Sequence, residues 1–404
     1  MSKETLILLG GSHYLLPVIE AAHEHDLHVV TMDYLPNNVA HRYSDEYRNV
    51  SVTDHEAVLK AAKELNANGI MSFACDPGVV SAAYVAQKMA LPFQCSYEAA
   101  CTLQDKGMFR AFLSEHGFAS PKSRRYTDAK AAVADADNLP WPVIVKPVDS
   151  AGSKGVTKLD GPEGLGRAID LALNYSQCGA FIVEQFLTFT GFHSSADAFT
   201  VDGNLAFCTY SDQLFDKDAD NPYTPVLIIW PSTMDARHQS ELTSETQRLM
   251  RLLGMRNGIY NIETCVATDG TPYLMEVSPR GGGCKIAELQ RLAYGIDLID
   301  AEVRSAVGIP IEPIKTRECD GFWCEMVVHA EPGRSGLLKS VTIDPVVREK
   351  HLVVEDITAL PGDMVEPFTG ANMALGDLFL RFETREELND IVSHASEWLR
   401  IDLA

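Results

Sequence analysis

Two glutamates, Glu263 and Glu276, stand in a stretch whose pattern predicts that they face each other. The stretch from Gly258 to Gly283 reads GIYNIETCVATDGTPYLMEVSPRGGG. Asp269-Gly270 is a strong hairpin signal, and it separates two runs of alternating apolar and polar residues. If these two residues form the whole loop, Glu263 lies opposite Glu276, with Cβ atoms roughly 5 Å apart.

Opposed carboxylates repel each other, so this hairpin needs a positive partner. Mg²⁺ prefers carboxylate oxygens and completes its shell with water and nucleotide phosphate. Asn261 is expected opposite Ser278, and Arg280 with three glycines follows. An arginine beside backbone that permits close approach suits a polyphosphate. The hairpin is interpreted as a metal and polyphosphate site; the alternative is a solvated hairpin followed by a glycine turn.

Two lysines lie upstream at positions that suit phosphate. Lys106 opens a helix predicted from Gln104 to Phe118, where a positive charge opposes the helix dipole unless an anion is within reach. Lys146 ends a strand predicted from Pro142 to Val145. The glycine and serine loop from Asp149 to Gly155 follows, and such backbone can wrap phosphate oxygens. The alternatives are a solvated lysine and an ordinary hairpin turn.

Glu184 is polar within the apolar strand predicted from Ala180 to Leu187. A buried glutamate needs a hydrogen-bond donor, and the exocyclic amine of adenine would supply one. A solvated glutamate on an edge strand is the alternative.

The elements that position these side chains begin with a βαβ unit. Strands predicted at residues 6–9 and 29–33 flank a helix at 18–25, which indicates a parallel sheet. Ser12 and Leu15 occupy glycine positions of the GxGxxG pattern, so an NAD site is disfavoured. Beyond the hairpin, helices are predicted from Lys285 to Tyr294 and onward to Gly308. Several strands follow, and a helix from Glu386 to Leu399 closes the chain.

Composition narrows the class of protein. The chain has 404 residues, a formal net charge of −22 and nine cysteines without a CxxC pair. Nucleic acid and anionic membranes demand basic patches, so neither is an expected partner. Scattered cysteines fit reduced thiols, and no apolar run approaches a membrane span. We expect a cytoplasmic protein that acts on small molecules.

In this order, the motifs resemble the ATP-grasp superfamily over essentially the whole chain. The resemblance implies a combined α/β and α+β architecture in three parts. These are a parallel-sheet pre-ATP-grasp domain at residues 1–103, a two-lobed ATP-grasp domain at 104–310 with a flap lobe at about 120–190, and a small α+β domain at 311–404 that completes the ATP-grasp region.

The resemblance also implies residue roles. Glu263 and Glu276 match the magnesium carboxylates, and Arg280 matches the arginine that holds the transferred phosphoryl group or acyl phosphate. Arg280 and Lys146 are the predicted catalytic residues. Ser278 stands where the family usually has asparagine, which implies a weaker or water-mediated metal contact. The predicted ATP-binding residues are Lys106, Lys146, Ser150, Gly152, Ser153, Gly155, Glu184, Leu187 and, where the family usually has a ribose-binding acid, His193.

The segment PRGGGCKIAELQRLAYGIDLI resembles the branch of amino-acid ligases and carbamoyl phosphate synthetases. This resemblance implies an ATP-dependent carboxylate-amine ligase that works through an acyl phosphate and releases ADP and phosphate. It also implies ATP and Mg²⁺ as cofactors, with Mn²⁺ as a substitute, and a homodimer. The alternatives are an ATP-binding regulatory protein of the same fold and an NAD-dependent oxidoreductase.

Overall fold

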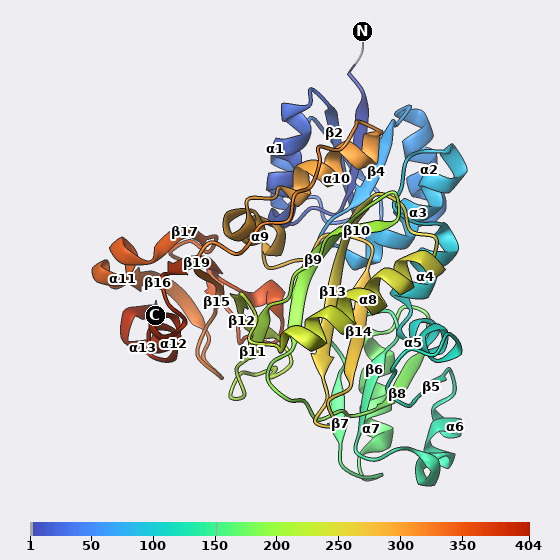
Figure 1. The fold of residues 1–404 in the computed structure, drawn as a ribbon, viewed down its shortest axis with the longest axis vertical. Helices are drawn as coiled ribbons and strands as arrows, with labels where there is room; N and C mark the ends of the chain where they lie inside the picture. The colour runs from blue at the N-terminus through green and yellow to red at the C-terminus, as the bar shows by residue number, and fades with distance from the viewer. Residues whose placement is uncertain (1–2, 151) are drawn as a thin grey trace.

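The computed structural model of the protein describes residues 3–150 and 152–404. Its first domain is a four-stranded parallel sheet in the order β3-β2-β1-β4 (Figure 1). Strand β1 is buried along its whole length because its two faces lie in different hydrophobic cores. The elements are β1 (Thr5–Leu9), η1 (His13–Leu15), α1 (Leu16–Glu24), β2 (His28–Asp33), η2 (Val39–Arg42), β3 (Glu46–Asn49), α2 (His55–Glu64), β4 (Gly69–Ser72), α3 (Asp76–Met89) and α4 (Tyr97–Gln104).

The second sheet is antiparallel, has the order β5-β8-β6-β7, and lies at the lower end of Figure 1. Helix α7 packs on it through a small hydrophobic core of its own. The elements of this part are α5 (Lys106–Glu115), β5 (Ser123–Tyr126), α6 (Ala129–Ala134), η3 (Ala136–Asn138), β6 (Val143–Pro147), β7 (Thr157–Leu159), α7 (Leu165–Tyr175) and β8 (Phe181–Gln185).

The third sheet has the order β10-β9-β13-β14 and carries the predicted hairpin. Helix α8 packs on β14 and β10, while α9 packs on β9 and α10 packs on β13. The elements are β9 (Ser194–Val201), β10 (Asn204–Phe207), α8 (Ala236–Leu252), β13 (Gly258–Val266), β14 (Pro272–Ser278), α9 (Ile286–Tyr294) and α10 (Leu298–Val307).

The C-terminal strands form a mixed assembly with an earlier hairpin. The pair β11 and β12, from the middle of the chain, joins a five-stranded sheet in the order β11-β12-β15-β19-β17, beside a three-stranded sheet β18-β16-β20. The elements are β11 (Asp212–Phe215), β12 (Pro225–Trp230), β15 (Phe322–Val328), β16 (Gly336–Ile343), α11 (Pro345–Lys350), β17 (Leu352–Ile357), β18 (Met364–Val365), η4 (Ala371–Met373), β19 (Gly376–Phe382), α12 (Arg385–Ser393), α13 (Ala395–Trp398) and β20 (Leu399–Leu403).

The closing helix predicted from Glu386 to Leu399 is confirmed as helical over most of its length, but it is broken at His394. Helix α12 ends at Ser393, and His394 has backbone angles φ −108° and ψ 27°, outside the helical region. A four-residue helix and strand β20 follow, and β20 pairs with β16 through Ile401 opposite Val341. Alternating apolar and polar residues in LRIDL suit a strand, so the chain ends in β20 and not in the predicted helix.

Helix α10 connects the first domain to the third sheet. It packs on α1 and β4 on one side and on β13 on the other. The Glu302 carboxylate on α10 accepts a hydrogen bond from the backbone N–H of Ile259 at 2.8 Å. No helix in the described part of the chain is both long and apolar enough to cross a membrane.

Candidate active site

A cavity of about 580 Å³ opens where the second sheet, the third sheet and the β11-β12 hairpin meet. It brings together side chains that lie far apart in the sequence. Gly155 and Ser278 do not line it. The predicted site residues that line it are Lys106, Lys146, Ser150, Gly152, Ser153, Glu184, Leu187, His193, Glu263, Glu276 and Arg280.

The predicted register of the hairpin is confirmed at the two glutamates. Glu263 pairs with Glu276, and Asn261 pairs with Ser278. The turn is longer than two residues, because pairing ends at Val266 with Pro272 and the Ala267 N–H donates to the Thr271 carbonyl. A β-bulge at Met275 compensates for the longer turn and returns Glu276 to the position opposite Glu263.

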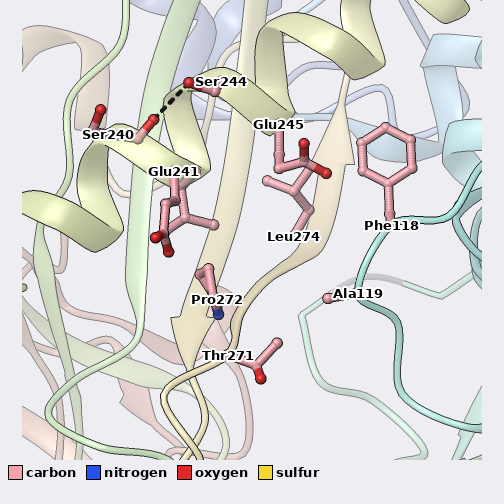
Figure 2. A pocket seen from close by; sticks show the side chains of 10 residues that line it. Phe118, Ala119, Ser240, Glu241, Ser244, Glu245, Thr271, Pro272 and Leu274 are labelled. Atoms are coloured by element: carbon pink, nitrogen blue, oxygen red, sulfur yellow. Dashed lines mark hydrogen bonds between the residues drawn. The ribbon is translucent and has the colours of Figure 1, made fainter.

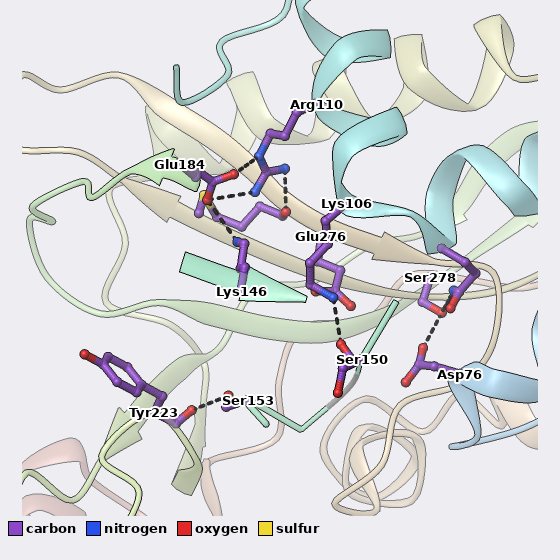
Figure 3. A network of polar contacts seen from close by, with 12 residues as sticks. Asp76, Lys106, Arg110, Lys146, Ser150, Ser153, Glu184, Tyr223, Glu276 and Ser278 are labelled. Atoms are coloured by element: carbon purple, nitrogen blue, oxygen red, sulfur yellow. Dashed lines mark hydrogen bonds and ion pairs between the residues drawn. The ribbon is translucent and has the colours of Figure 1, made fainter. Parts of the chain in front are cut away.

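Arg110 binds the backbone carbonyl that this bulge exposes, which belongs to Met275. Its Nη1 donates to the Met275 carbonyl oxygen at 2.8 Å. The same guanidinium donates through Nε to Glu184 Oε2 at 2.5 Å, so one side chain ties the hairpin to strand β8 (Figure 3). The sequence analysis missed Arg110. Its position four residues after Lys106, on the same face of helix α5, is the signal that could have revealed it.

The opposed carboxylates make the cavity strongly negative at one point. Burial, and then the charge of Glu276, raise the pKa of the Glu263 carboxyl above its usual range. Lys106 Nζ lies 3.7 Å from Glu276 Oε2, which offsets part of this charge. Two carboxylates at hairpin distance can hold a divalent cation whose other ligands are water and phosphate oxygens. The described residues contain no group of three or more His, Cys, Asp or Glu that could hold a metal ion without such help.

Glu184 is buried, with 1% of its surface exposed, and protein groups satisfy its carboxylate. Lys146 Nζ donates to Oε1 at 2.9 Å, and Arg110 binds from the other side. Burial alone would raise the pKa of Glu184, but the charges of Arg110 and Lys146 outweigh burial and hold that pKa at about 2. Burial lowers the pKa of Lys146, an effect that Glu184 opposes. A lysine ammonium has three donors, so Lys146 keeps donors for a further anion.

The predicted phosphate loop lies across the mouth of this cavity. Lys106 Nζ donates to the Ser150 carbonyl at 2.9 Å, and Ser153 Oγ donates to the Tyr223 carbonyl at 2.9 Å (Figure 3). Ala151, inside the predicted loop, lies outside the described residues. The loop therefore contacts both the Lys106 helix and the segment between β11 and β12, which the sequence analysis did not include in the site.

Arg280 is anchored to the first domain by Asp76. Asp76 stands at the start of α3 and accepts from Arg280 Nε at 2.9 Å and from Nη2 at 2.7 Å. Nη1 donates to the Gly281 carbonyl. A guanidinium has five N–H donors, so two remain for a ligand. The sequence analysis did not identify Asp76, because its partner lies 204 residues away.

Ser278 is buried beside this pair and does not face the cavity. Its hydroxyl donates to Asp76 Oδ1 at 2.9 Å and accepts from Gln104 Nε2 at 2.7 Å. Both contacts hold strand β14 against the first domain. The predicted metal contact of Ser278 remains a prediction, and in this arrangement it would require a bridging water.

The glycine segment after Arg280 is fixed by a buried carboxylate. Asp197 on β9 accepts from the Gly282 N–H at 2.9 and 3.0 Å and from Asn261 Nδ2 at 3.0 Å. A Cβ placed on Gly281 would lie 2.1 Å from the Phe73 ring. This segment needs glycine for close packing, and its backbone is held in one place.

The other end of the cavity is largely apolar. Leu187, Phe189 and Phe215 line it together with His193, whose ring packs against both phenylalanine rings. Burial lowers the pKa of His193 to about 4, so the ring is neutral at physiological pH. A neutral ring among aromatic side chains suits a flat, uncharged base.

A second hollow of about 400 Å³ lies between helix α8 and the segment at Phe118 (Figure 2). Its acidic side chains already have partners, since Glu241 pairs with Arg237 and Glu245 pairs with Arg248. None of the predicted site residues lines it. The cavity between the sheets is therefore the candidate active site.

Comparisons with known proteins agree with this geometry. Residues 139–288 match the family model of the ATP-grasp domain. A formate-dependent phosphoribosylglycinamide formyltransferase from Synechococcus sp. is 25% identical over 316 residues, which are 77% of this chain and 78% of the relative. A D-alanine–D-alanine ligase from Anaeromyxobacter dehalogenans is 25% identical over 218 residues, which are 52% of this chain and 68% of the relative.

The fold is shared along the entire chain. The crystal structure of an L-amino acid ligase from Bacillus licheniformis has a TM-score of 0.81 with this chain at 18% identity, and 100% of each chain is covered. The predicted fold class is confirmed by this likeness, and the predicted resemblance to the ATP-grasp superfamily is confirmed by the match of residues 139–288 to the ATP-grasp domain.

Proposed function

We propose that this protein is an ATP-dependent carboxylate-amine ligase that forms an amide or peptide bond. The observation that carries this proposal is the opposed pair Glu263 and Glu276, which shares one cavity with Lys106, Lys146 and Arg280. A substrate carboxylate attacks the γ-phosphate of ATP to give an acyl phosphate and ADP. An amine then attacks the acyl carbon and displaces phosphate, so no protein nucleophile is required.

The proposed cation is Mg²⁺, with Mn²⁺ as a substitute. Held by the carboxylates of Glu263 and Glu276, it would neutralise charge on the transferring phosphoryl group. Burial and the charge of Glu276 raise the pKa of Glu263, and a bound divalent cation would oppose both effects.

The chain's own residues position and neutralise the reactants. Lys106 and Lys146 present ammonium groups to the phosphates, and the loop with Ser150, Gly152 and Ser153 covers them. The two unpaired N–H donors of Arg280 are directed to the transferred phosphoryl group or the acyl phosphate. The apolar end with Leu187 and His193 receives the adenosine.

Small-molecule carboxylates and amines are the proposed substrates. The cavity is lined by residues of one chain, and its volume of about 580 Å³ suits small molecules. A cytoplasmic location and a homodimer are proposed on the family resemblance. Analytical ultracentrifugation of the purified protein tests the dimer.

The test is substrate-dependent ADP release over a panel of amino acids and small carboxylic acids in pairs. We expect release with at least one pair, and a loss of roughly 100-fold or more in Glu276→Gln and in Arg280→Ala. Glu241→Gln on helix α8, outside the cavity, is the matched control and should keep full activity. Full turnover by Glu276→Gln or Arg280→Ala would contradict the proposal.

The regulatory alternative makes a different prediction. An ATP-binding regulator would bind ATP, measured by calorimetry, and release no ADP with any pair. The presence of both carboxylates and of Arg280 in the cavity favours chemistry over regulation.

A further inference from the structure

A second group of charged side chains lies where helix α9 meets the C-terminal sheet, outside the cavity described above. Strand pairing puts Val327 opposite Asp377 and Asp377 opposite Asp356, so Glu325 and the two aspartates share one face of neighbouring strands. Helix α9 packs on β15 (Figure 1), which brings Lys285 at the start of that helix to this face.

Two of these carboxylates are buried without partners. Glu325 is 1% exposed and Asp377 is 2% exposed. Both oxygens of Glu325 and Oδ1 of Asp377 have no hydrogen-bond partner among the described residues. Leaving a buried polar group unpaired costs about 1–3 kcal/mol, and more for a charged group. Such groups call for an explanation other than packing.

The nearby lysine does not balance the charge. Lys285 forms an ion pair with Asp356 and lies 4.0 Å from Glu288. No ion pair joins Glu325 or Asp377 to a basic side chain in the described ranges. The group therefore holds four carboxyl groups and one lysine, and burial raises the pKa of Glu325, Asp377 and Glu288.

The outer side chains of the group are partly exposed, and a short segment of chain connects the group to Arg280. The side chains of Lys285, Glu288 and Asp356 are 11%, 19% and 35% exposed. Only the glycine segment and Cys284 separate Lys285 from Arg280 in the sequence. Burial raises the pKa of the Cys284 thiol, and the charges of Glu325 and Asp377 raise it further.

The connecting backbone is strained. Cys284 and Lys285 have φ values of 52° and 49°, a conformation that residues with a Cβ rarely adopt. Two such residues in succession cost of order 1–3 kcal/mol each and persist where the surroundings hold them. This conformation carries the chain from Arg280 to the acidic face.

We propose that Glu325 and Asp377 form a subsite for a positively charged nitrogen group, ammonium or guanidinium, of the ligase substrate. The inference rests on the proposed function and adds the chemical class of substrate. A cation with several N–H donors would satisfy the three unpaired oxygens together and restore the charge balance. Lys285 would keep Asp356 occupied and leave the buried pair to the ligand.

The test is calorimetric binding to the full chain with two pairs of probes that differ by one ammonium group. L-Lysine against L-norleucine reports a side-chain cation, and L-alanine against L-lactate reports an α-ammonium group. We expect the ammonium member of at least one pair to bind roughly tenfold tighter or more. Glu325→Gln and Asp377→Asn should remove that difference.

Glu355→Gln is the matched control. Glu355 lies on strand β17, pairs with Arg348 of helix α11 and is not part of the group. It should keep the discrimination. The proposal is overturned if neither pair shows a difference, or if both folded variants discriminate like the native protein. Binding requires no turnover. If the native protein discriminates between the probes but releases no ADP with any substrate pair, the proposed function is contradicted and the subsite is not.

Discussion

Arg110 connects two strands beside the cavity, and the sequence analysis missed it. Its side chain is 3% exposed and contacts Glu184 on β8 and the Met275 carbonyl on β14. Glu184 in turn holds Lys146. The charges of Arg110, Glu184 and Lys146 depend on one another, because removing one of them leaves the others without full compensation. Arg110 therefore positions Lys146, the lysine proposed to bind phosphate, without lining the cavity itself.

Arg110→Ala should destabilise the protein by about 3–5 kcal/mol, because it leaves Glu184 buried with one cation instead of two. Arg237→Ala is the matched control: Arg237 forms an exposed pair with Glu241 on α8, so its loss should leave the unfolding free energy close to the native value. Urea unfolding measures both changes. Equal values for the two variants would show that the buried triad contributes nothing beyond a surface pair.

Residues of the site could be predicted where the chemistry is local. Glu263 and Glu276 lie on one hairpin, so alternation and a turn signal were enough to pair them. Asp76 and Arg110 could not be found in this way, because their partners lie 204 and 74 residues away. Neither residue has a sequence neighbour that reveals its partner.

At the scale of elements, the two glutamates of the hairpin pair as predicted although the loop is longer than predicted. The turn extends beyond Asp269-Gly270, and only the bulge at Met275 restores the expected register. A bulge depends on what binds its free carbonyl, here Arg110, and no local pattern encodes that contact. The strand after the closing helix is a second case, since β20 is fixed by its pairing with β16.

The glycine segment after Arg280 should not tolerate a side chain. In Gly281→Ala the new Cβ would meet the buried Phe73 ring, so we expect a loss of about 1–3 kcal/mol in unfolding free energy. Displacement of Arg280 should also lower kcat/KM for ADP release by roughly 10- to 100-fold. Thermal unfolding and steady-state kinetics measure the two effects.

Gly166→Ala is the control for that substitution. Gly166 lies in helix α7, and a Cβ there meets no atom within 4 Å. The replacement should leave kcat/KM unchanged and stabilise the helix by about 0.5–1 kcal/mol. If Gly281→Ala behaved like this control, close packing of the segment would not be needed for activity.

At the scale of the whole molecule, several buried carboxyl groups tie the domains together. Burial raises the pKa of Asp197 to about 6 and that of Glu302 to about 8. Asp197 holds the glycine segment on the third sheet, and Glu302 lies on the helix that connects this sheet to the first domain. Because their pKa values are raised, these two carboxyl groups hold protons more tightly in the folded state. Their protonation makes the folded chain less negative than its formal net charge of −22.

The stability of the protein should therefore fall as pH rises across the range in which Glu302 ionises. Its folded pKa, about 8, lies above its ordinary 4.5, so the folded state binds more protons than the unfolded state between these values. The stabilisation is fully present below pH 4.5 and is lost as pH rises through 8. One such proton contributes a slope of roughly 1.4 kcal/mol per pH unit.

Glu302→Gln removes the titrating group and keeps an oxygen that can accept from the Ile259 N–H. Chemical denaturation from pH 5 to pH 8 should show a flatter decline for this variant than for the native protein. Glu24→Gln, at the exposed end of α1, makes the same change in net charge and should keep the native slope. If both variants kept that slope, Glu302 would not be the group that couples protonation to the joint between the first domain and the third sheet.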